Sequence, residues 1–308
     1  MSQTTSNILM IRPASFGFNE QTAESNAFQQ NSTNLQQVQQ KVAQEFNNFA
    51  ALLGSKSVNV TVIDDTAEPQ KPDAIFPNNW VSFHDNGDVI LYPMQAENRR
   101  WERREDVVRK LEDHFKINHI IDLGRFELEH KFLEGTGSMV LDRENKIAYA
   151  CLSPRTDVEV LNTFCDYLHY TAVTFAATDA GQQAIYHTNV MMCVGSKFAV
   201  ICLDSIQNVG EKETVINSLN NTGKEIVAIT LEQMNHFAGN MLELQNNEGK
   251  KLLIMSQSAH QSLSEDQIKT LEKYTEIVSA DLNTIETIGG GSARCMLAEV
   301  HLPLQSRQ

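Results

Sequence analysis

Short apolar runs alternate with amphipathic stretches along almost the whole chain. Residues 7–12 form the first apolar run, which ends at Pro13 and predicts a strand. Residues 21–53 are rich in Gln and Asn, yet their apolar positions recur every three or four residues. This spacing predicts an amphipathic helix rather than a low-complexity segment. The apolar positions are Leu35, Val38, Val42, Phe46, Phe49 and Leu52.

The rest of the chain repeats one order of elements, in which a hairpin is followed by a helix and a short strand. Asn86 and Gly87 between two strand-like runs are typical of a hairpin turn. Ser264 and Gln267 have the spacing of a capping box at the start of the last helix. The predicted extended segments are 57–63, 74–83, 89–92, 119–122, 132–141, 147–151, 172–176, 186–195, 197–203, 225–229, 241–245, 251–256, 277–280 and 296–301. The predicted helices after the first are 99–114, 158–168, 211–220 and 264–275.

About five such units fit into the chain, and they share a pattern without sharing sequence. Because none could bury its apolar faces alone, we expect the five to close in a ring. No linker rich in Pro, Ser or Gly divides the chain. We therefore predict an α/β fold and a single domain, residues 1–308, with flexible ends at residues 1–6 and 304–308.

The composition of the chain limits the classes of partner that it can bind. Its 308 residues, 41% of them hydrophobic, can bury a sizeable core. The net charge of −14 argues against nucleic acid and against an anionic membrane surface, because both attract basic faces. The start lacks the features of a signal peptide, and no apolar run reaches the roughly 18 residues of a membrane span. We expect a cytoplasmic protein, and the sequence leaves a homo-oligomer open.

The five cysteines are odd in number and scattered, and none forms a CxxC pair, so we expect neither a metal site nor a redox centre. Cys295 differs from the others because it follows a run of glycines, residues 289–291, and adjoins Arg294. The glycines allow the backbone to approach a ligand closely, and a guanidinium favours the nucleophilic thiolate. Taken alone, the segment is more often a surface loop before an edge strand, with an inert thiol. The glycines match neither the dinucleotide fingerprint nor the P-loop.

Three other segments combine reactive side chains with an irregular loop, and each lies where a strand of a different unit begins. They are residues 76–80 with Asn78 and Asn79, residues 133–138 with Glu134, and residues 186–190 with His187. In a closed ring these equivalent ends would face one central cavity. A thiol, an imidazole and a carboxylate in one pocket can perform nucleophilic catalysis. Each residue alone is more often structural.

Together these segments resemble the guanidine-modifying, amidinotransferase-like enzymes, which include arginine deiminases and dimethylarginine hydrolases. The motifs are Phe-Pro-Asn-Asn-Trp at 76–80, Glu-Gly-Thr-Gly-Ser at 134–138, His-Thr-Asn at 187–189 and Gly-Gly-Gly-Ser-Ala-Arg-Cys-Met at 289–296. The opening Ile-Arg-Pro-Ala-Ser-Phe-Gly-Phe-Asn at 11–19 is most similar to the citrulline-utilisation hydrolase branch. The resemblance extends from Arg12 to Leu302.

The resemblance implies a five-bladed α/β propeller, or pentein, which agrees with the count of units. It also implies that Cys295 is the nucleophile, that His187 is the general acid and base, and that Glu134 is a substrate-holding carboxylate. In related deiminases two aspartates clasp the guanidinium, and the matching positions here are Asn79 and Asn189. Losing both anions would cost a guanidinium several kcal/mol, whereas amides match a neutral ureido group. We therefore expect a ureido substrate such as citrulline.

The expected reaction is hydrolysis of citrulline to ornithine, ammonia and carbon dioxide through a carbamoyl thioester, without a metal or cofactor. Arg99 or Arg100 is a candidate for the substrate carboxylate, although both equally fit a solvated helix start. Arg294 could share that role or depress the pKa of the thiol. His236, Asn235 and Asn240 lie in a loop of the fourth unit that could line the cavity.

Three alternatives remain open. An arginine deiminase would use the same Cys and His chemistry on a cation. An amidinotransferase would need a second acceptor site, which the sequence does not reveal. A non-catalytic member of the fold would bind a small amino-acid-like ligand, and its thiol would react slowly with alkylating agents.

Overall fold

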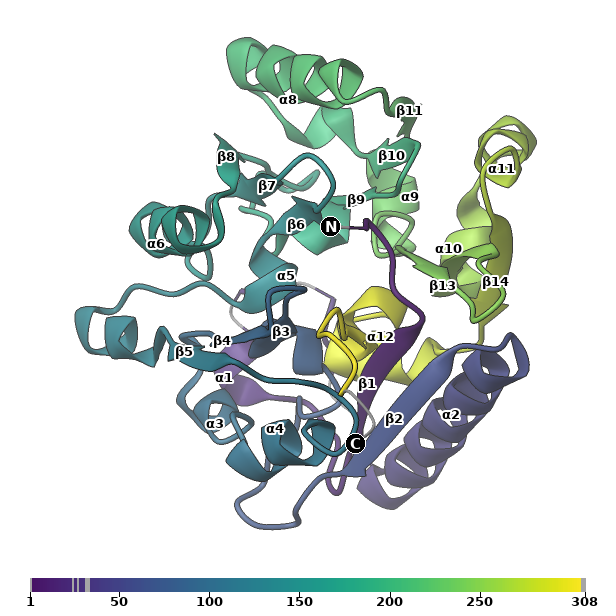
Figure 1. Ribbon diagram of the computed structural model, residues 1–308. Helices are drawn as coiled ribbons and strands as arrows, with labels where there is room; N and C mark the ends of the chain where they lie inside the picture. Colours follow the sequence, from purple (N-terminus) through teal and green to yellow (C-terminus); the bar gives the residue numbers. More distant parts are fainter. Residues whose placement is uncertain (1, 24, 27, 31–33, 306–308) are drawn as a thin grey trace.

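The computed structural model describes residues 2–305 except 24, 27 and 31–33, and its strands within these residues form five sheets of three strands each (Figure 1). The first sheet joins both ends of the chain and consists of β1 (Asn7–Arg12), β2 (Asn59–Asp64) and β15 (Ala298–Glu299). The others are β3 (Val81–Phe83), β4 (Asp88–Leu91) and β5 (His119–Asp122); β6 (Val140–Asp142), β7 (Ile147–Cys151) and β8 (Thr171–Phe175); β9 (Met192–Val194), β10 (Phe198–Ile201) and β11 (Glu225–Ala228); and β12 (Leu242–Gln245), β13 (Lys251–Ser256) and β14 (Glu276–Ala280).

All five sheets share one topology. The middle strand pairs antiparallel with one neighbour and parallel with the other. A parallel pair needs a crossover, and a helix supplies it in every sheet. These helices are α2 (Leu35–Ser55), α4 (Glu105–Leu111), α6 (Val158–Leu168), α8 (Val209–Asn221) and α11 (Glu265–Glu272). The expected order of hairpin, helix and strand is therefore present in an α/β fold that fits a pseudo-fivefold repeat.

The crossover helices lie towards the outside in Figure 1, and each packs an apolar face inward. On α2 the buried side chains are Val38, Val42, Phe46, Phe49 and Leu53, so four of the predicted positions are confirmed. Of the other two, Leu35 is exposed, and Leu53 is buried in place of Leu52. The predicted helix at 21–53 is too long, because α2 begins only after Asn34, whose side chain accepts from the backbone of Gln37. A separate turn, α1 (Glu20–Ala23), precedes it. Asn34 is thus the N-cap that separates the helix from the Gln- and Asn-rich loop.

The predicted segments 74–83, 132–141, 186–195 and 296–301 are only partly extended. Short helical turns lie at the start of these regions or just before them, and each is followed by the strand that pairs antiparallel with the middle strand of its sheet. The turns are the 3₁₀ turn Pro77–Asn79, α5 (Gly135–Ser138), α7 (Thr188–Met191) and the 3₁₀ turn Ala293–Met296. They are closed by local bonds such as that from Gly137 N to Glu134 O, so they are too short to leave a helical period in the sequence.

Two other expectations need correction. The predicted helix 99–114 is divided into α3 (Glu97–Arg100) and α4. The expected flexible start is wrong for residues 3–5, which are buried, and the Gln3 side chain donates to the carbonyls of Leu141 and Val194. At the other end, Gln305 N donates to His114 O, and residues 306–308 lie outside the described residues. The capping box of Ser264 and Gln267 is present, as predicted.

The helical turns meet near the centre of the molecule. Turn α5 contacts both Pro77–Asn79 and α7, and Pro77–Asn79 also contacts Ala293–Met296. In the fourth unit, residues 237–240 after α9 (Leu231–Asn235) take the same place before β12. Figure 1 shows α5 and α12 (Asn283–Gly289) in this central region. In the part of the chain that the structure describes, no helix is both long and apolar enough to cross a membrane.

Candidate functional site

A small pocket lies where the helical turns meet, and it contains Cys295, His187, Asn79 and Arg99. Its volume is about 20 Å³. The other lining residues are Asn26, Asp73, Phe76, Arg155, Tyr186, Gly289, Gly290 and Gly291. Asn26 belongs to the loop before α2 and donates to the carbonyls of Gly289 and Gly290, so this loop covers the glycine run.

Glu134 and His187 form a buried pair beside the pocket. The Nε2 atom of His187 lies 2.8 Å from Oε2 of Glu134, and Gln95 N donates to Oε1 at 3.1 Å. Burial alone would raise the pKa of Glu134, but Arg155, His187 and Arg99 outweigh it and hold the pKa below its usual range. Glu134 is therefore a carboxylate whose main contact is the imidazole.

His187 is neutral in this environment, because burial and two nearby arginines lower its pKa to about 4 despite the contact with Glu134. Since Glu134 is ionised, Nε2 carries the proton and donates to it, which leaves Nδ1 as an acceptor. A Cβ added at Gly137 would lie 2.8 Å from Nδ1 and 2.4 Å from Nδ2 of Asn79. Glycine at 137 is thus what allows the imidazole and this amide to approach the turn.

Two side-chain amides contact the sulfur of Cys295, which is only 4% exposed. Asn240 Nδ2 lies 3.3 Å from Sγ, and Asn189 Nδ2 lies 3.5 Å from it. The Asn240 amide is held in turn, because its oxygen accepts from Arg294 N at 3.0 Å and its nitrogen donates to Asn189 O at 2.9 Å. Amide donors placed in this way can stabilise negative charge on the sulfur.

Arg99 fixes the orientation of Asn79. Its Nη1 donates to Asn79 Oδ1 at 2.9 Å, and its Nε and Nη2 bind Glu102 as a bidentate pair at 2.8 and 2.9 Å. The amide nitrogen of Asn79 donates to Oδ1 of Asn78 at 3.1 Å. Because Arg99 occupies the oxygen of Asn79, the nitrogen of that amide is the donor that remains near Gly137 and His187.

Two charged residues of the pocket did not figure among the sequence candidates. Arg155 is buried, with Nη1 3.5 Å from Oε2 of Glu134 and its guanidinium 4.8 Å from the ring centre of Tyr186. Asp73 accepts from Asn19 through Oδ2, but its Oδ1 has no hydrogen-bond partner among the described residues. Burial raises the pKa of Asp73. Neither belongs to a recognisable motif; the only signal was the position of Asp73, three residues before Phe76.

Several sequence candidates lie outside the pocket. Arg294 binds Glu299 at 2.8 Å and the carbonyl of Leu297, so its guanidinium faces an adjacent cavity rather than the pocket that contains Cys295. Asn189 lines that same cavity while its amide reaches Cys295. Asn78 is buried beside Thr136, to which it donates.

Of the remaining candidates, one contacts the sulfur of Cys295 and the others lie away from the pocket. Arg100 binds the carbonyl of Met94 and lies 3.4 Å from Glu127. In the fourth unit, Asn240 reaches the sulfur, but His236 bonds Ser258 in a different groove. Among the described residues, no group of three or more His, Cys, Asp or Glu side chains could hold a metal ion.

The comparisons with known proteins point to one group of enzymes. A family model described as "N,N dimethylarginine dimethylhydrolase, eukaryotic" matches residues 12–302. The N-terminal domain of ArgZ bound to substrate, an arginine dihydrolase from the ornithine-ammonia cycle in cyanobacteria, gives a TM-score of 0.73 at 17% identity over 96% of this chain and 98% of that one. AgrE with L-arginine gives 0.72 at 15% identity, over 97% of this chain and 41% of that longer one.

A dimethylarginine dimethylaminohydrolase carrying an adduct with S-methyl-L-thiocitrulline gives a TM-score of 0.62 at 14% identity, over 95% and 98% of the two chains. No curated protein matches the chain. The structural likenesses show the fold, and the family model, which spans nearly the whole chain, shows the family. The motif resemblance to the guanidine-modifying superfamily is thereby confirmed, and this chain belongs to the family described as N,N-dimethylarginine dimethylhydrolase, eukaryotic.

Proposed function

We propose that this protein is a cysteine-dependent hydrolase that cleaves a C–N bond of a ureido or guanidino amino acid, with citrulline as its preferred substrate. The observation that carries the proposal is the set of neutral amides around one thiol. Asn189 and Asn240 donate to Cys295, and Asn79 lines the pocket with an N–H that Arg99 leaves available. A ureido group has one carbonyl acceptor and several N–H donors, which amides match, whereas a guanidinium prefers paired carboxylates.

In the first half of the reaction, Cys295 attacks the ureido carbon. The thiol proton passes to Nδ1 of His187, because Nε2 is held by Glu134. The ureido oxygen takes the negative charge of the tetrahedral species, and the amide N–H of Asn79 stabilises it. His187 then gives its proton to the departing alkyl nitrogen, the C–N bond breaks, and ornithine leaves.

The second half removes the carbamoyl group from Cys295. A water molecule attacks the thioester carbon while His187 accepts its proton, the C–S bond breaks, and the proton returns to the sulfur. The released carbamate decomposes to ammonia and carbon dioxide. The side chains of the pocket supply every proton transfer in this scheme.

The amino-acid end of the substrate has its own partners. We infer that Asp73 binds the α-ammonium group through Oδ1, the oxygen without a partner among the described residues. Arg155 binds the α-carboxylate, since among the described residues its Nη1 is held only by the longer contact with Glu134. Arg99 is less suited to that role than expected, because its bidentate contact with Glu102 and its bond to Asn79 occupy its donors.

We also infer that the five units close into a five-bladed propeller that forms one domain. Neighbouring units meet through their first strands, since β15 contacts β3, β6 contacts β9, and β9 contacts β12. The pairing of β15 with β1 brings the C-terminal strand into the sheet of the N-terminal strand. Each unit would then contribute one helical turn to the centre, where the pocket lies.

The second candidate function is hydrolysis of a guanidino substrate such as arginine. It is favoured by the carboxylate oxygen of Asp73 that has no partner in the described part of the chain and lies in the pocket, where it could take a guanidinium instead of an ammonium group. It is also favoured by the similar structures, which include an arginine dihydrolase and AgrE with L-arginine. Transfer of an amidino group to an amine, or ligand binding without catalysis, has no such support.

The test is to supply purified protein with citrulline, arginine or dimethylarginine in parallel and to measure ornithine, citrulline and ammonia. Cys295→Ser serves as the blank. Cys193→Ser serves as a matched control, because Cys193 is buried and its pKa is raised to about 12 by burial. Ornithine from citrulline supports the proposal. Citrulline or ornithine from arginine, with citrulline itself left intact, would replace it with the guanidino alternative.

A further inference from the structure

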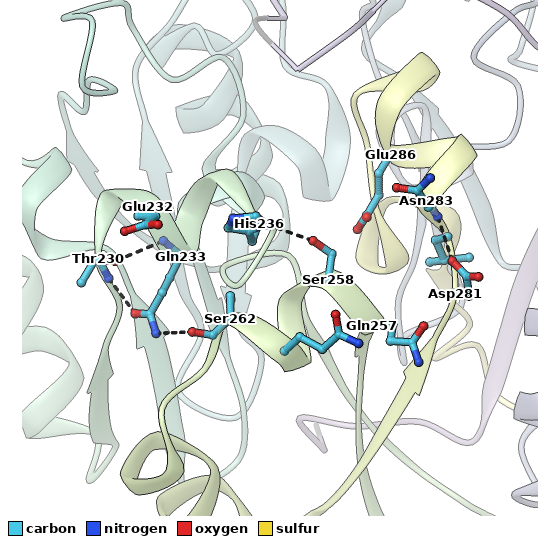
Figure 2. A pocket seen from close by; sticks show the side chains of 12 residues that line it. Thr230, Glu232, Gln233, His236, Gln257, Ser258, Ser262, Asp281, Asn283 and Glu286 are labelled. Carbon is cyan, nitrogen blue, oxygen red and sulfur yellow. Dashed lines mark hydrogen bonds between the residues drawn. The ribbon is translucent and has the colours of Figure 1, made fainter.

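A second, more open hollow lies between α9, α10 (Gln257–Ser262) and α12, and Figure 2 shows the polar side chains around it. This polar groove has a volume of about 800 Å³ and shares no lining residue with the substrate pocket. Its lining residues are Thr230, Glu232, Gln233, His236, Gln257, Ser258, Gln261, Ser262, Asp281, Leu282, Asn283 and Glu286. They include three carboxylates and no Lys or Arg.

Glu286 is the lining residue that also reaches the catalytic loop. It points into the groove from α12 in Figure 2, yet it is only 5% exposed. Ser292 Oγ donates to its Oε1 at 2.6 Å in a buried hydrogen bond. Ser292 lies three residues before Cys295, and its carbonyl accepts from Cys295 N at 3.0 Å. The carboxyl group is therefore two hydrogen bonds away from the backbone of the nucleophile.

The backbone of Glu286 holds the other end of the same loop. Its carbonyl accepts from Gly290 N at 3.0 Å, and Gly290 has a φ of +62°, the left-handed conformation that favours glycine. The three glycines have no side chains with which to fix their own position. Glu286 thus binds the loop both at Gly290 and at Ser292, on either side of its last glycine.

We propose that Glu286 is a positioning residue, which holds the glycine loop so that the sulfur of Cys295 faces Asn240 and Asn189. The role rests on the proposed function of Cys295 as the nucleophile. Glu286 touches neither the substrate pocket nor the sulfur, so it acts through Ser292 and the loop. Because its carboxyl group also lines the polar groove, water in the groove has access to a group that positions the nucleophile.

The surroundings of Glu286 favour its protonated form. The described residues place no Lys or Arg within ion-pair distance of it, and burial, together with Glu45 and Asp281, raises its pKa to about 7 despite bonds from Ser256 and Ser292. Glu232 of α9 and His236, which follows α9, line the other side of the groove. Near neutral pH the bond to Ser292 is therefore made by a carboxyl group that is partly protonated.

The experiment compares Glu286→Ala, Glu286→Gln and Ser292→Ala with Glu232→Gln, a control that changes the groove but not the loop. The rate of alkylation of Cys295 by iodoacetamide and the kcat and KM for the substrate are measured, with the pH varied from 5 to 9. Loss of one buried hydrogen bond is expected to lower the alkylation rate and kcat by about tenfold in Glu286→Ala and Ser292→Ala. KM and the Glu232→Gln control should stay within about twofold of wild type.

Rescue separates positioning from a merely structural role. The amide oxygen of Glu286→Gln can still accept from Ser292, so this variant should keep most of the wild-type rate across the pH range. Unchanged alkylation in Glu286→Ala, or equal loss in Glu286→Gln and Glu286→Ala, would overturn the role. If Glu286→Ala does not fold, Ser292→Ala decides the same question. A wild-type Cys295 that reacts no faster than Cys193 would instead overturn the proposed function.

Discussion

Glu134 and Glu286 are both buried carboxyl groups near the centre of the molecule, and their pKa values move in opposite directions. Burial acts on both and by itself raises the pKa. Around Glu134, two arginines and His187 reverse that effect, so the carboxylate stays ionised beside the imidazole. Glu286 faces acidic neighbours instead, and its pKa rises to about 7.

The difference shows that burial disfavours ionisation of a carboxyl group. The neighbouring charges then decide whether the group is ionised in the folded protein. Glu134 acts in its ionised form, because its carboxylate fixes the tautomer of His187. The role that we propose for Glu286 needs only an acceptor for Ser292, which either protonation state provides. The comparison can be tested by removing the charge from each site and by removing the neighbours that control it.

The largest effect is expected from Glu134→Gln. The amide keeps the shape but loses the charge that stabilises protonated His187, so we expect kcat to fall about 100- to 1,000-fold. Steady-state kinetics against Glu127→Gln, a control outside the pocket, measure the loss. In the wild type, kcat/KM should fall only as the pH drops towards about 4, where His187 becomes protonated. An acidic limb near the ordinary histidine value would contradict the neutral imidazole.

A smaller but still large effect is expected from Arg155→Met, which leaves Glu134 with less positive charge. Breaking a buried pair on one side should lower the free energy of unfolding by about 3 kcal/mol at pH 7. Urea unfolding measures this change, and Arg109→Met is the control, because its pair with Glu105 is exposed and screened by solvent. The double variant Arg155→Met/Glu134→Gln should be more stable than Arg155→Met alone, since no carboxylate is then left without its partner.

These two sites also show how far the sequence could lead. The strands at 147–151 and 251–256 and the helix at 158–168 were predicted with the observed bounds, because their apolar periods and caps are local. The pattern of apolar positions also predicted the repeated unit of hairpin, helix and strand. It could not give the helical turns that carry Asn79 and Cys295, which span three or four residues and depend on single hydrogen bonds.

For the site, the motifs led to residues that the structure brings together in or beside the pocket, namely Cys295, His187 and Glu134. The counter-ions were not predictable. Arg155 reaches Glu134 from a loop between β7 and α6, and no motif contains it. Arg294 adjoins Cys295 in sequence, yet Glu299 holds its guanidinium away from the pocket. Contacts between units decide which charged side chains form pairs. The spacing of residues along the chain does not reveal these contacts.

Glu286→Gln should change how stability depends on pH. The pKa of Glu286 in the folded protein, about 7, lies above the ordinary glutamate value of 4.5. Between these values the folded state binds more protons than the unfolded state, so wild-type stability falls as the pH rises from about 4.5 to 7. This fall amounts to at most about 3 kcal/mol. Urea unfolding at pH 5 and pH 8 should show it as a difference between wild type and Glu286→Gln. Parallel curves for the two proteins would contradict the raised pKa.

The smallest effect is expected from Asp281→Asn, which removes one of the acidic neighbours of Glu286. Asp281 is exposed, so solvent screens its charge, and the pKa of Glu286 should fall by less than about one unit. The amide can still accept from Asn283 N, which keeps the start of α12 intact. A carboxyl-carbon NMR titration, with Glu286→Gln to assign the signal, measures the shift. Glu45→Gln should lower the pKa more, because Glu45 contributes more than Asp281 and is partly buried. If neither variant moves the titration, burial alone raises the pKa of Glu286, and the contrast with Glu134 then rests on the missing arginine rather than on acidic neighbours.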